Sequence, residues 1–213
     1  MHKKVLKTWN WSKVKKNQYF LLGCFFLSLQ VLVFWVNFQA QRYEVFFWFC
    51  NHAPLFFSIG FFFKKFDIIK ALINVGFLGQ IFWTLDFVFK LFFDFYLFGI
   101  TDYIFEDPNG VLVLIPILVH VAATNIALFF TYKKKPTMHV FLLSVIYVIF
   151  LYGVSLTYTL EGKNVNCVYE NCIGFLNFSF YTYFWPVLVT FLVVLPTHLL
   201  QILIYRKYSR KKK

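Results

Sequence analysis

The residues best suited to chemistry are a cysteine and a histidine that lie within apolar segments, Cys50 and His120. A thiol surrounded by apolar side chains is a poor nucleophile unless a neighbouring imidazole takes its proton. The histidine of such a pair acts as a general base, and a carboxylate such as that of Asp86 can orient its ring. These residue types therefore point to hydrolysis or transfer of an acyl group.

The three side chains can meet only if their segments place them at one depth in a bundle. Counted from the expected outer ends of their helices, Cys50 lies about five residues deep, Asp86 about six and His120 about ten, which puts them within roughly 8 Å along the membrane normal. A shared pocket in the outer half is therefore possible. His52 diverges from Cys50 by about 200° on a helix, so the two cannot point into the same site.

Other polar residues of the apolar segments are expected to support this pair. Because a polar group inside a membrane span is costly, it usually faces the bundle interior or water. The small and polar residues from Gly76 to Asp86 fall within an arc of about 120°, which predicts an inward face that includes Gly79. The expected supporting residues are Asp86, Gln80, His52, Asn51, Thr124 and Asn125. Near the end of the last apolar segment, Thr197, His198 and Gln201 are expected to be solvated at the membrane interface.

Each of these residues also has an interpretation without catalysis. Cys50 could be a packed small residue, and His120 could make only an interhelical hydrogen bond. Asp86 could pair with His120 or with the amide of Gln80. His52 could donate a hydrogen bond to the site or face the outer headgroups.

Six apolar segments must position these side chains. Hydrophobic residues make up 60% of the chain and charged residues only 14%, which excludes a water-soluble domain. A hydrocarbon core of roughly 30 Å needs about 20 helical residues per span. The chain is therefore expected to be a single all-α transmembrane domain over residues 1–213. Its expected spans are about 19–38, 45–63, 68–93, 110–132, 139–158 and 181–205.

The distribution of basic residues predicts the orientation. If the N-terminus is cytoplasmic, 18 of the 21 Lys and Arg residues lie on the cytoplasmic side. This asymmetry follows the positive-inside rule and places both termini in the cytoplasm of a multi-pass protein of the cell membrane, the plasma membrane if the source is microbial. The basic segments then lie beside the anionic lipids of the inner leaflet, which accounts for the net charge of +12. No nucleic-acid partner is therefore expected.

Two further cysteines lie in the loop between the last two segments. On the predicted topology Cys167 and Cys172 face the oxidising side, where a disulfide between them is favoured over two free thiols. The sequence contains neither a phosphate-binding glycine loop nor the His or Cys spacing of a metal site. No cofactor and no metal are therefore expected.

Three short motifs carry a resemblance to a known family. They are Phe49 to Leu55, Gly76 to Asp86, and His120 within Leu-Val-His. In these motifs, and over most of its length, the chain resembles the YwaF-like six-helix integral membrane proteins, which are related to the androgen-induced membrane hydrolases and to a eukaryotic acyltransferase. In that wider group a Thr or Cys nucleophile begins the second helix and a His lies in the fourth. The resemblance implies Cys50 as nucleophile and His120 as base.

The sequence departs from the family pattern at two positions and leaves three functions open. Leu85 precedes Asp86 where a proline is expected, and His52 occupies a position that is usually apolar. The favoured function is a membrane hydrolase or acyltransferase acting on a lipid or other small-molecule ester. The alternatives are a small transporter with Asp86 and His120 as a proton relay, and a noncatalytic membrane subunit. No inverted repeat is evident, which disfavours the transporter.

Overall fold

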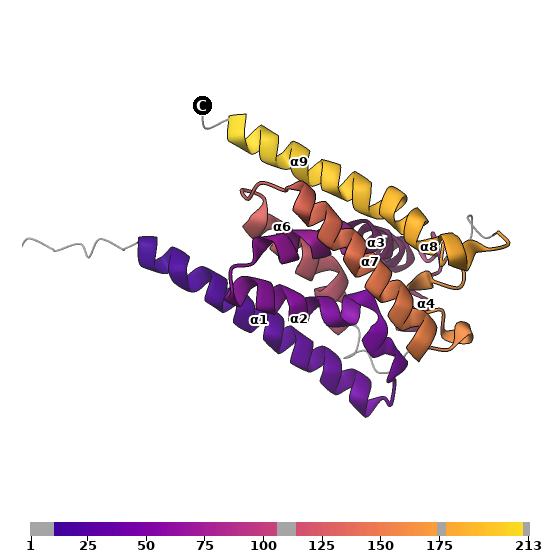
Figure 1. Cartoon of the computed structure of the whole chain (residues 1–213). Coiled ribbons are helices and arrows are strands. Elements are labelled where there is room, and N and C mark those ends of the chain that lie inside the picture. The colour runs from indigo at the N-terminus through magenta and orange to yellow at the C-terminus, as the bar shows by residue number, and fades with distance from the viewer. Residues whose placement is uncertain (1–10, 106–113, 174–177, 211–213) are drawn as a thin grey trace, which may run out of the picture.

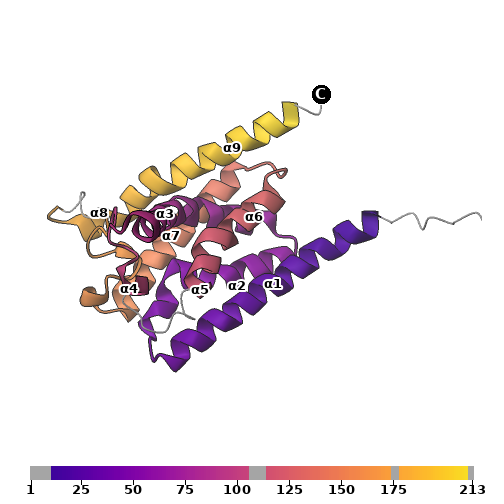
Figure 2. The ribbon, with the colours of Figure 1, turned by 180° about the vertical axis from the view of Figure 1, so that it is seen from behind.

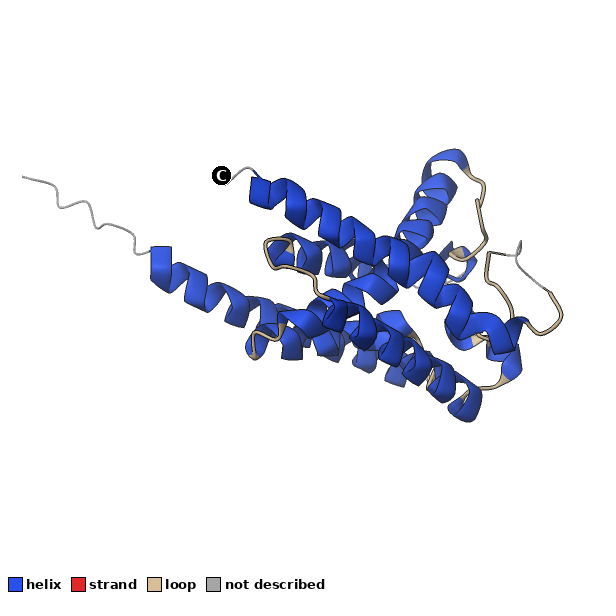
Figure 3. Ribbon diagram, turned by 45° about the horizontal axis from the view of Figure 1, so that its top comes forward, coloured by secondary structure: helices blue, strands red, loops and turns tan. Residues whose placement is uncertain are grey.

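The chain folds into a bundle of helices (Figure 1). The structure is a computed structural model that describes residues 11–105, 114–173 and 178–210, and among these residues no strand occurs. Figure 3 shows helices and loops only, which confirms the all-helical prediction. The continuous long helices are α1 (Trp11–Gln39), α3 (Phe66–Phe93) and α7 (Met138–Tyr158). The turn expected at Asp107 to Gly110 lies outside the described residues.

Two further columns each contain a π-helical segment between α-helical ones. The first runs through α5 (Leu114–Ile117), the π-helix η3 (Leu118–Ala123) and α6 (Thr124–Thr131). The second runs through α8 (Tyr181–Val189), the π-helix η6 (Thr190–Val194) and α9 (Leu195–Arg210). π-Helical turns are rare, and they occur frequently at functional sites.

Within the described part of the chain, five helices are long and apolar enough to cross a membrane, which is compatible with a multi-pass integral membrane protein. They cover Asn17–Gln39, Phe66–Phe93, Leu114–Thr131, Met138–Tyr158 and Tyr181–Arg210. The remaining apolar helix, α2 (Phe49–Phe62), has 14 residues and is about 21 Å long, which is shorter than a hydrocarbon core of roughly 30 Å. The six-span topology and the cytoplasmic termini therefore stay predictions.

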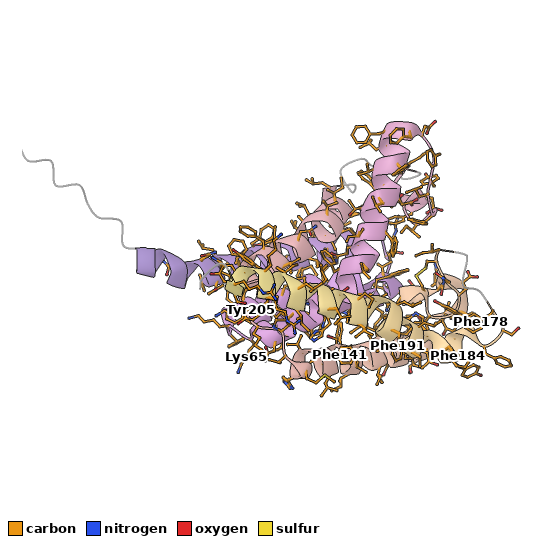
Figure 4. The ribbon with its side chains drawn as sticks, turned by 90° about the horizontal axis from the view of Figure 1, so that it is seen from above. Lys65, Phe141, Phe178, Phe184, Phe191 and Tyr205 are labelled. Atoms are coloured by element: carbon orange, nitrogen blue, oxygen red, sulfur yellow. A yellow bond between two sulfur atoms is a disulfide. The ribbon has the colours of Figure 1, made fainter. Side chains whose placement is uncertain are left out.

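Helix α3 lies at the centre of the bundle. It packs against α2, α6, α7 and α9, while α1 pairs with α2 at one side and α9 lies at the other (Figures 1 and 2). Figure 4 shows that the C-terminal half of α3 leans away from the α7 and α9 columns. The same view places Lys65 and Tyr205 toward one end of the bundle and Phe178 at the other.

The two largest apolar clusters hold most of these helices together, and a third contains Trp83, Phe87 and Ile104. The larger joins α1, α2, α3 and α6 through fully buried residues such as Phe26, Phe57 and Ile73. The smaller joins α7 to the α8–η6 column through Val148, Leu151 and other side chains. Since fully burying one such side chain contributes about 1.5 to 3 kcal/mol, these clusters fix the helices that carry the polar residues described next.

Candidate functional site

The first turn of α2 is held by a side chain from α1. Pro54 lies inside α2 and has no backbone N–H to donate. Beside it, the Gln30 amide donates to the Asn51 carbonyl at 2.8 Å and accepts from the Leu55 N–H at 2.9 Å. The Gln30 side chain thus satisfies both backbone groups where the turn is interrupted, and it fixes the helix that carries Cys50.

The loop before α8 holds the same turn from a second side. The Asn166 side chain accepts from the Phe49 N–H at 2.8 Å and donates to the Phe47 carbonyl at 2.9 Å and to Ser155 Oγ at 3.0 Å. Asn166 has a φ of 56°, a conformation that Asn tolerates better than most residues. Next to it, Cys167 and Cys172 form a disulfide with their Cα atoms 5.5 Å apart.

His52 faces a different neighbour from Cys50. Its Nε2 lies 2.5 Å from the Tyr147 hydroxyl of α7, and its Nδ1 lies 3.2 Å from the Phe46 carbonyl. The neighbouring Asn51 amide donates to the Val45 carbonyl at 2.7 Å. Both imidazole nitrogens of His52 are therefore engaged, Nδ1 with the segment before α2 and Nε2 with α7. Cys50, a free and partly buried thiol, packs against the larger apolar cluster instead.

His120 lies in the π-helix η3 and is oriented by an aromatic ring. Its imidazole stacks on the Trp83 indole of α3 with ring centroids 4.3 Å apart and 11° between the ring planes. None of the residues that the structure describes forms a hydrogen bond with this imidazole. His120 is therefore fixed in orientation, and neither ring nitrogen is held by a hydrogen bond from a described residue.

Asp86 is fully buried and fastens the loop that follows α3. Its carboxylate accepts hydrogen bonds from the backbone N–H groups of Phe98 (2.7 Å), Gly99 (3.2 Å) and Thr101 (3.0 Å). It also accepts one from the Thr101 hydroxyl at 2.8 Å. No hydrogen bond joins Asp86 to His120 or to Gln80, so in this geometry Trp83, and not a carboxylate, orients the imidazole.

Tyr103 is linked to the candidate base through Trp83. The Tyr103 hydroxyl accepts a hydrogen bond from Trp83 Nε1 at 3.2 Å, and Trp83 stacks on His120. Although the Tyr103 side chain is 45% exposed, the protein atoms around its hydroxyl raise the pKa of the phenol, and interaction with Cys50 adds to this rise. No hydrogen bond links Cys50 directly to His120. Nothing in the sequence distinguishes Tyr103 from the other tyrosines, so sequence reasoning misses it.

The expected supporting residues on α3 and α6 lie beside a small hollow. Gln80 and Asn125 line a cavity of about 120 Å³ together with Phe77, Ile81, Thr84 and Leu85. The Asn125 amide donates to the Val121 carbonyl at 2.6 Å, whereas both amide atoms of Gln80 and the Thr124 hydroxyl are buried without a partner among the described residues. Gln80 therefore has unused hydrogen-bonding capacity inside the bundle.

A second polar cluster, at the contact of α3, α7 and α9, was not predicted. The Lys70 ammonium donates to Gln201 Oε1 at 3.0 Å, and Gln201 Nε2 donates to Asn74 Oδ1 at 2.6 Å. Asn74 in turn donates to Ser144 Oγ at 2.9 Å and lies 3.2 Å from His198 Nδ1. All five side chains are buried, as is Thr197, so the expectation that Thr197, His198 and Gln201 are solvated is wrong. The spacing of Lys70 and Asn74 by four residues on one helix face was the available signal.

Gly76 is needed for the close approach of α3 to the start of α2. A Cβ atom there would clash with the Cε1 and Cζ atoms of the Phe49 ring, next to Cys50. We expect Gly76→Ala to lower the free energy of unfolding by about 1 to 3 kcal/mol, which thermal melting would measure. Gly79 is the matched control, because it is exposed, contrary to the predicted inward face, and a Cβ atom there would have no neighbouring side chain within 4 Å. Equal melting of Gly76→Ala and Gly79→Ala would contradict the packing role of Gly76.

Comparison with protein-family models, with curated proteins and with solved structures finds no match for this chain. The assignment of roles to its residues therefore depends on their geometry.

Proposed function

We propose that the protein is a membrane enzyme that cleaves or transfers the acyl group of a lipid ester, with Cys50 as nucleophile and His120 as general base. The observation that carries this proposal is the way in which the start of α2 is held. Side chains from α1, from α7 and from the loop before α8 bond the backbone or the side chains around Cys50, yet no side chain in the described part of the chain bonds the thiol itself. Such fixation is what a positioned nucleophile requires.

The chemistry divides into two steps. In the first, the Cys50 sulfur attacks the ester carbonyl, His120 takes the thiol proton, and the alcohol leaves with that proton, which gives an acyl-thioester. In the second, water or an acceptor alcohol attacks the thioester and the thiol is regenerated. When His120 is protonated, its ring lies over the face of the Trp83 indole, which stabilises a cation. Trp83 therefore supports the charge that the base must carry.

The transporter alternative receives less support from the contacts. A proton relay needs a carboxylate that can exchange its proton, and the Asp86 carboxylate already accepts four hydrogen bonds from the loop after α3. Four donors fix the position of the carboxylate and occupy its oxygens, which suits a structural role better than a proton relay.

Acylation of the purified full-length protein tests this function. The protein in detergent is mixed with a long-chain acyl p-nitrophenyl ester, and intact mass and hydroxylamine sensitivity report a thioester. We expect acylation of Cys50 in the wild type, none in Cys50→Ala, and a rate about 100-fold lower in His120→Gln, since a general base contributes at least this much.

The other free cysteine supplies the control. Cys24 lies in α1 and is also partly buried, so Cys24→Ala should keep the wild-type rate. Thermal melting of each variant shows whether it is folded. An unchanged rate in a folded His120→Gln protein, or acylation of Cys24 as fast as that of Cys50, would refute the proposal.

A further inference from the structure

The hollow between α3 and α6 has the composition of a binding site for an uncharged polar group. Its volume is about 120 Å³, close to that of an engineered cavity of about 150 Å³ that binds benzene. Phe77, Ile81 and Leu85 provide apolar walls, and Gln80, Thr84 and Asn125 provide polar atoms. None of these six lining residues carries a charge.

Gln80 is the unusual residue in this hollow. Its side chain is only 5% exposed, and neither Nε2 nor Oε1 has a hydrogen-bonding partner among the described residues. Buried polar side-chain atoms are nearly always bonded, because leaving them without a partner is costly. Elsewhere in the same bundle, the buried amides of Gln30, Asn74 and Gln201 are all bonded. The Gln80 amide therefore needs a partner that the described part of the chain does not supply.

The hollow opens between the two helices at the surface of the bundle. Leu85 is 41% exposed and Asn125 is also exposed, and both lie at its wall. Gln80, which lines the hollow, precedes Trp83 by three residues on α3. Since residues three or four apart share a helix face, the hollow lies about one turn from the stacked pair of Trp83 and His120.

We infer that this hollow binds the uncharged polar head of a single-chain lipid, a protonated fatty acid or a fatty alcohol, whose tail lies between α3 and α6 in the bilayer. A hydroxyl or carboxyl group can donate to Gln80 Oε1 and accept from Gln80 Nε2 at the same time. A phosphate or ammonium head would enter without an opposite charge to pair with it, which is unfavourable inside a membrane. A role for the bound lipid as substrate or product depends on the proposed function, whereas the binding does not.

Photo-crosslinking of the full-length protein in nanodiscs tests this inference. All variants carry Cys50→Ala, so the result does not depend on acyl transfer. A diazirine-labelled palmitic acid or hexadecanol should label peptides that contain Phe77 to Leu85 or Val121 to Asn125. We expect Gln80→Met to reduce this labelling about tenfold and to leave the melting temperature unchanged or raised, because the substitution removes two unbonded buried atoms.

Two controls make the result decisive. Gln18 lines a separate, more open hollow with Leu21, Leu22 and Phe130, so Gln18→Met should label like the parent protein. Competition by unlabelled palmitic acid but not hexadecanol would identify a carboxyl head, and the reverse would identify a hydroxyl head. Hexadecane should compete about tenfold less well than either.

Two outcomes would overturn the inference. They are equal labelling of folded Gln80→Met and parent protein, and equal competition by hexadecane and the polar lipids. Failure of the proposed function has a different signature, because head-selective labelling would persist while Cys50 remained unacylated in the wild-type chain.

Discussion

Replacing Asp86 with alanine is expected to lower the free energy of unfolding by about 4 kcal/mol and the melting temperature by about 10 °C. The Asp86 carboxylate accepts three backbone N–H groups and the Thr101 hydroxyl, and Thr101 is fully buried. Without the carboxylate, the two donors of the buried Thr101 lose their acceptor inside the protein, and the loop loses two further bonds from Phe98 and Gly99. Melting of the detergent-solubilised protein, followed by intrinsic tryptophan fluorescence, measures the change.

The reference variants for this prediction are Asp86→Asn and Asp94→Ala. An asparagine keeps the shape and one acceptor oxygen, so about half of the destabilisation is expected. The Asp94 carboxylate is exposed and pairs with Lys90 at 2.7 Å on the surface, so its replacement should change the melting temperature by no more than about 2 °C. If Asp86→Ala melted like Asp94→Ala, the loop after α3 would not depend on the buried carboxylate.

Replacing Gln201 with leucine is expected to destabilise the protein by about 3 to 5 kcal/mol, because it leaves the buried Lys70 ammonium without its acceptor. The same substitution removes the donor to the Lys70 carbonyl and to Asn74 Oδ1. Adding Lys70→Met should restore at least about 2 kcal/mol, since the double variant buries no unpaired charge. A melting series of the wild type, both single variants and the double variant measures this coupling.

Additive effects would contradict the coupling. If the double variant lost the sum of the two single losses, the Lys70 ammonium would not depend on Gln201. Ser209→Ala is a suitable control on the same helix, because its hydroxyl bonds the Arg206 carbonyl on the surface and its loss should change the melting temperature little.

The helices could be predicted from the sequence because long apolar runs separated by lysines leave few alternatives. The start of α2 could not. The residues Phe46, Phe47 and Trp48 are as apolar as a membrane span, yet they precede the helix, which begins at Phe49. The backbone carbonyl of Phe47 bonds Asn166, which lies 119 residues further along the chain, and such a contact leaves no pattern in the local sequence.

The candidate site was predictable to a similar degree. That Cys50 and His52 face different neighbours follows from helix geometry alone. The partners of Asp86 do not, because they are backbone N–H groups of a loop that folds back onto α3, and every residue except proline carries such a group. Lys70 has the sequence context of a lysine at the inner membrane surface, and only the packing of α9 shows that it is buried.

The π-helix η3 divides the column of α5, η3 and α6 into two halves whose side chains face different directions. A π-turn contains one residue more than an α-turn, so the helix faces before and after it are offset by about 100°. Deleting one residue other than His120 from Leu118 to Ala123 would convert the column to a continuous α-helix without shortening its apolar length much. His120 could then face Trp83, or Ala127 could face the core, but not both. A related protein that lacks one residue in this segment could thus keep the fold and still lose the contact between His120 and Trp83.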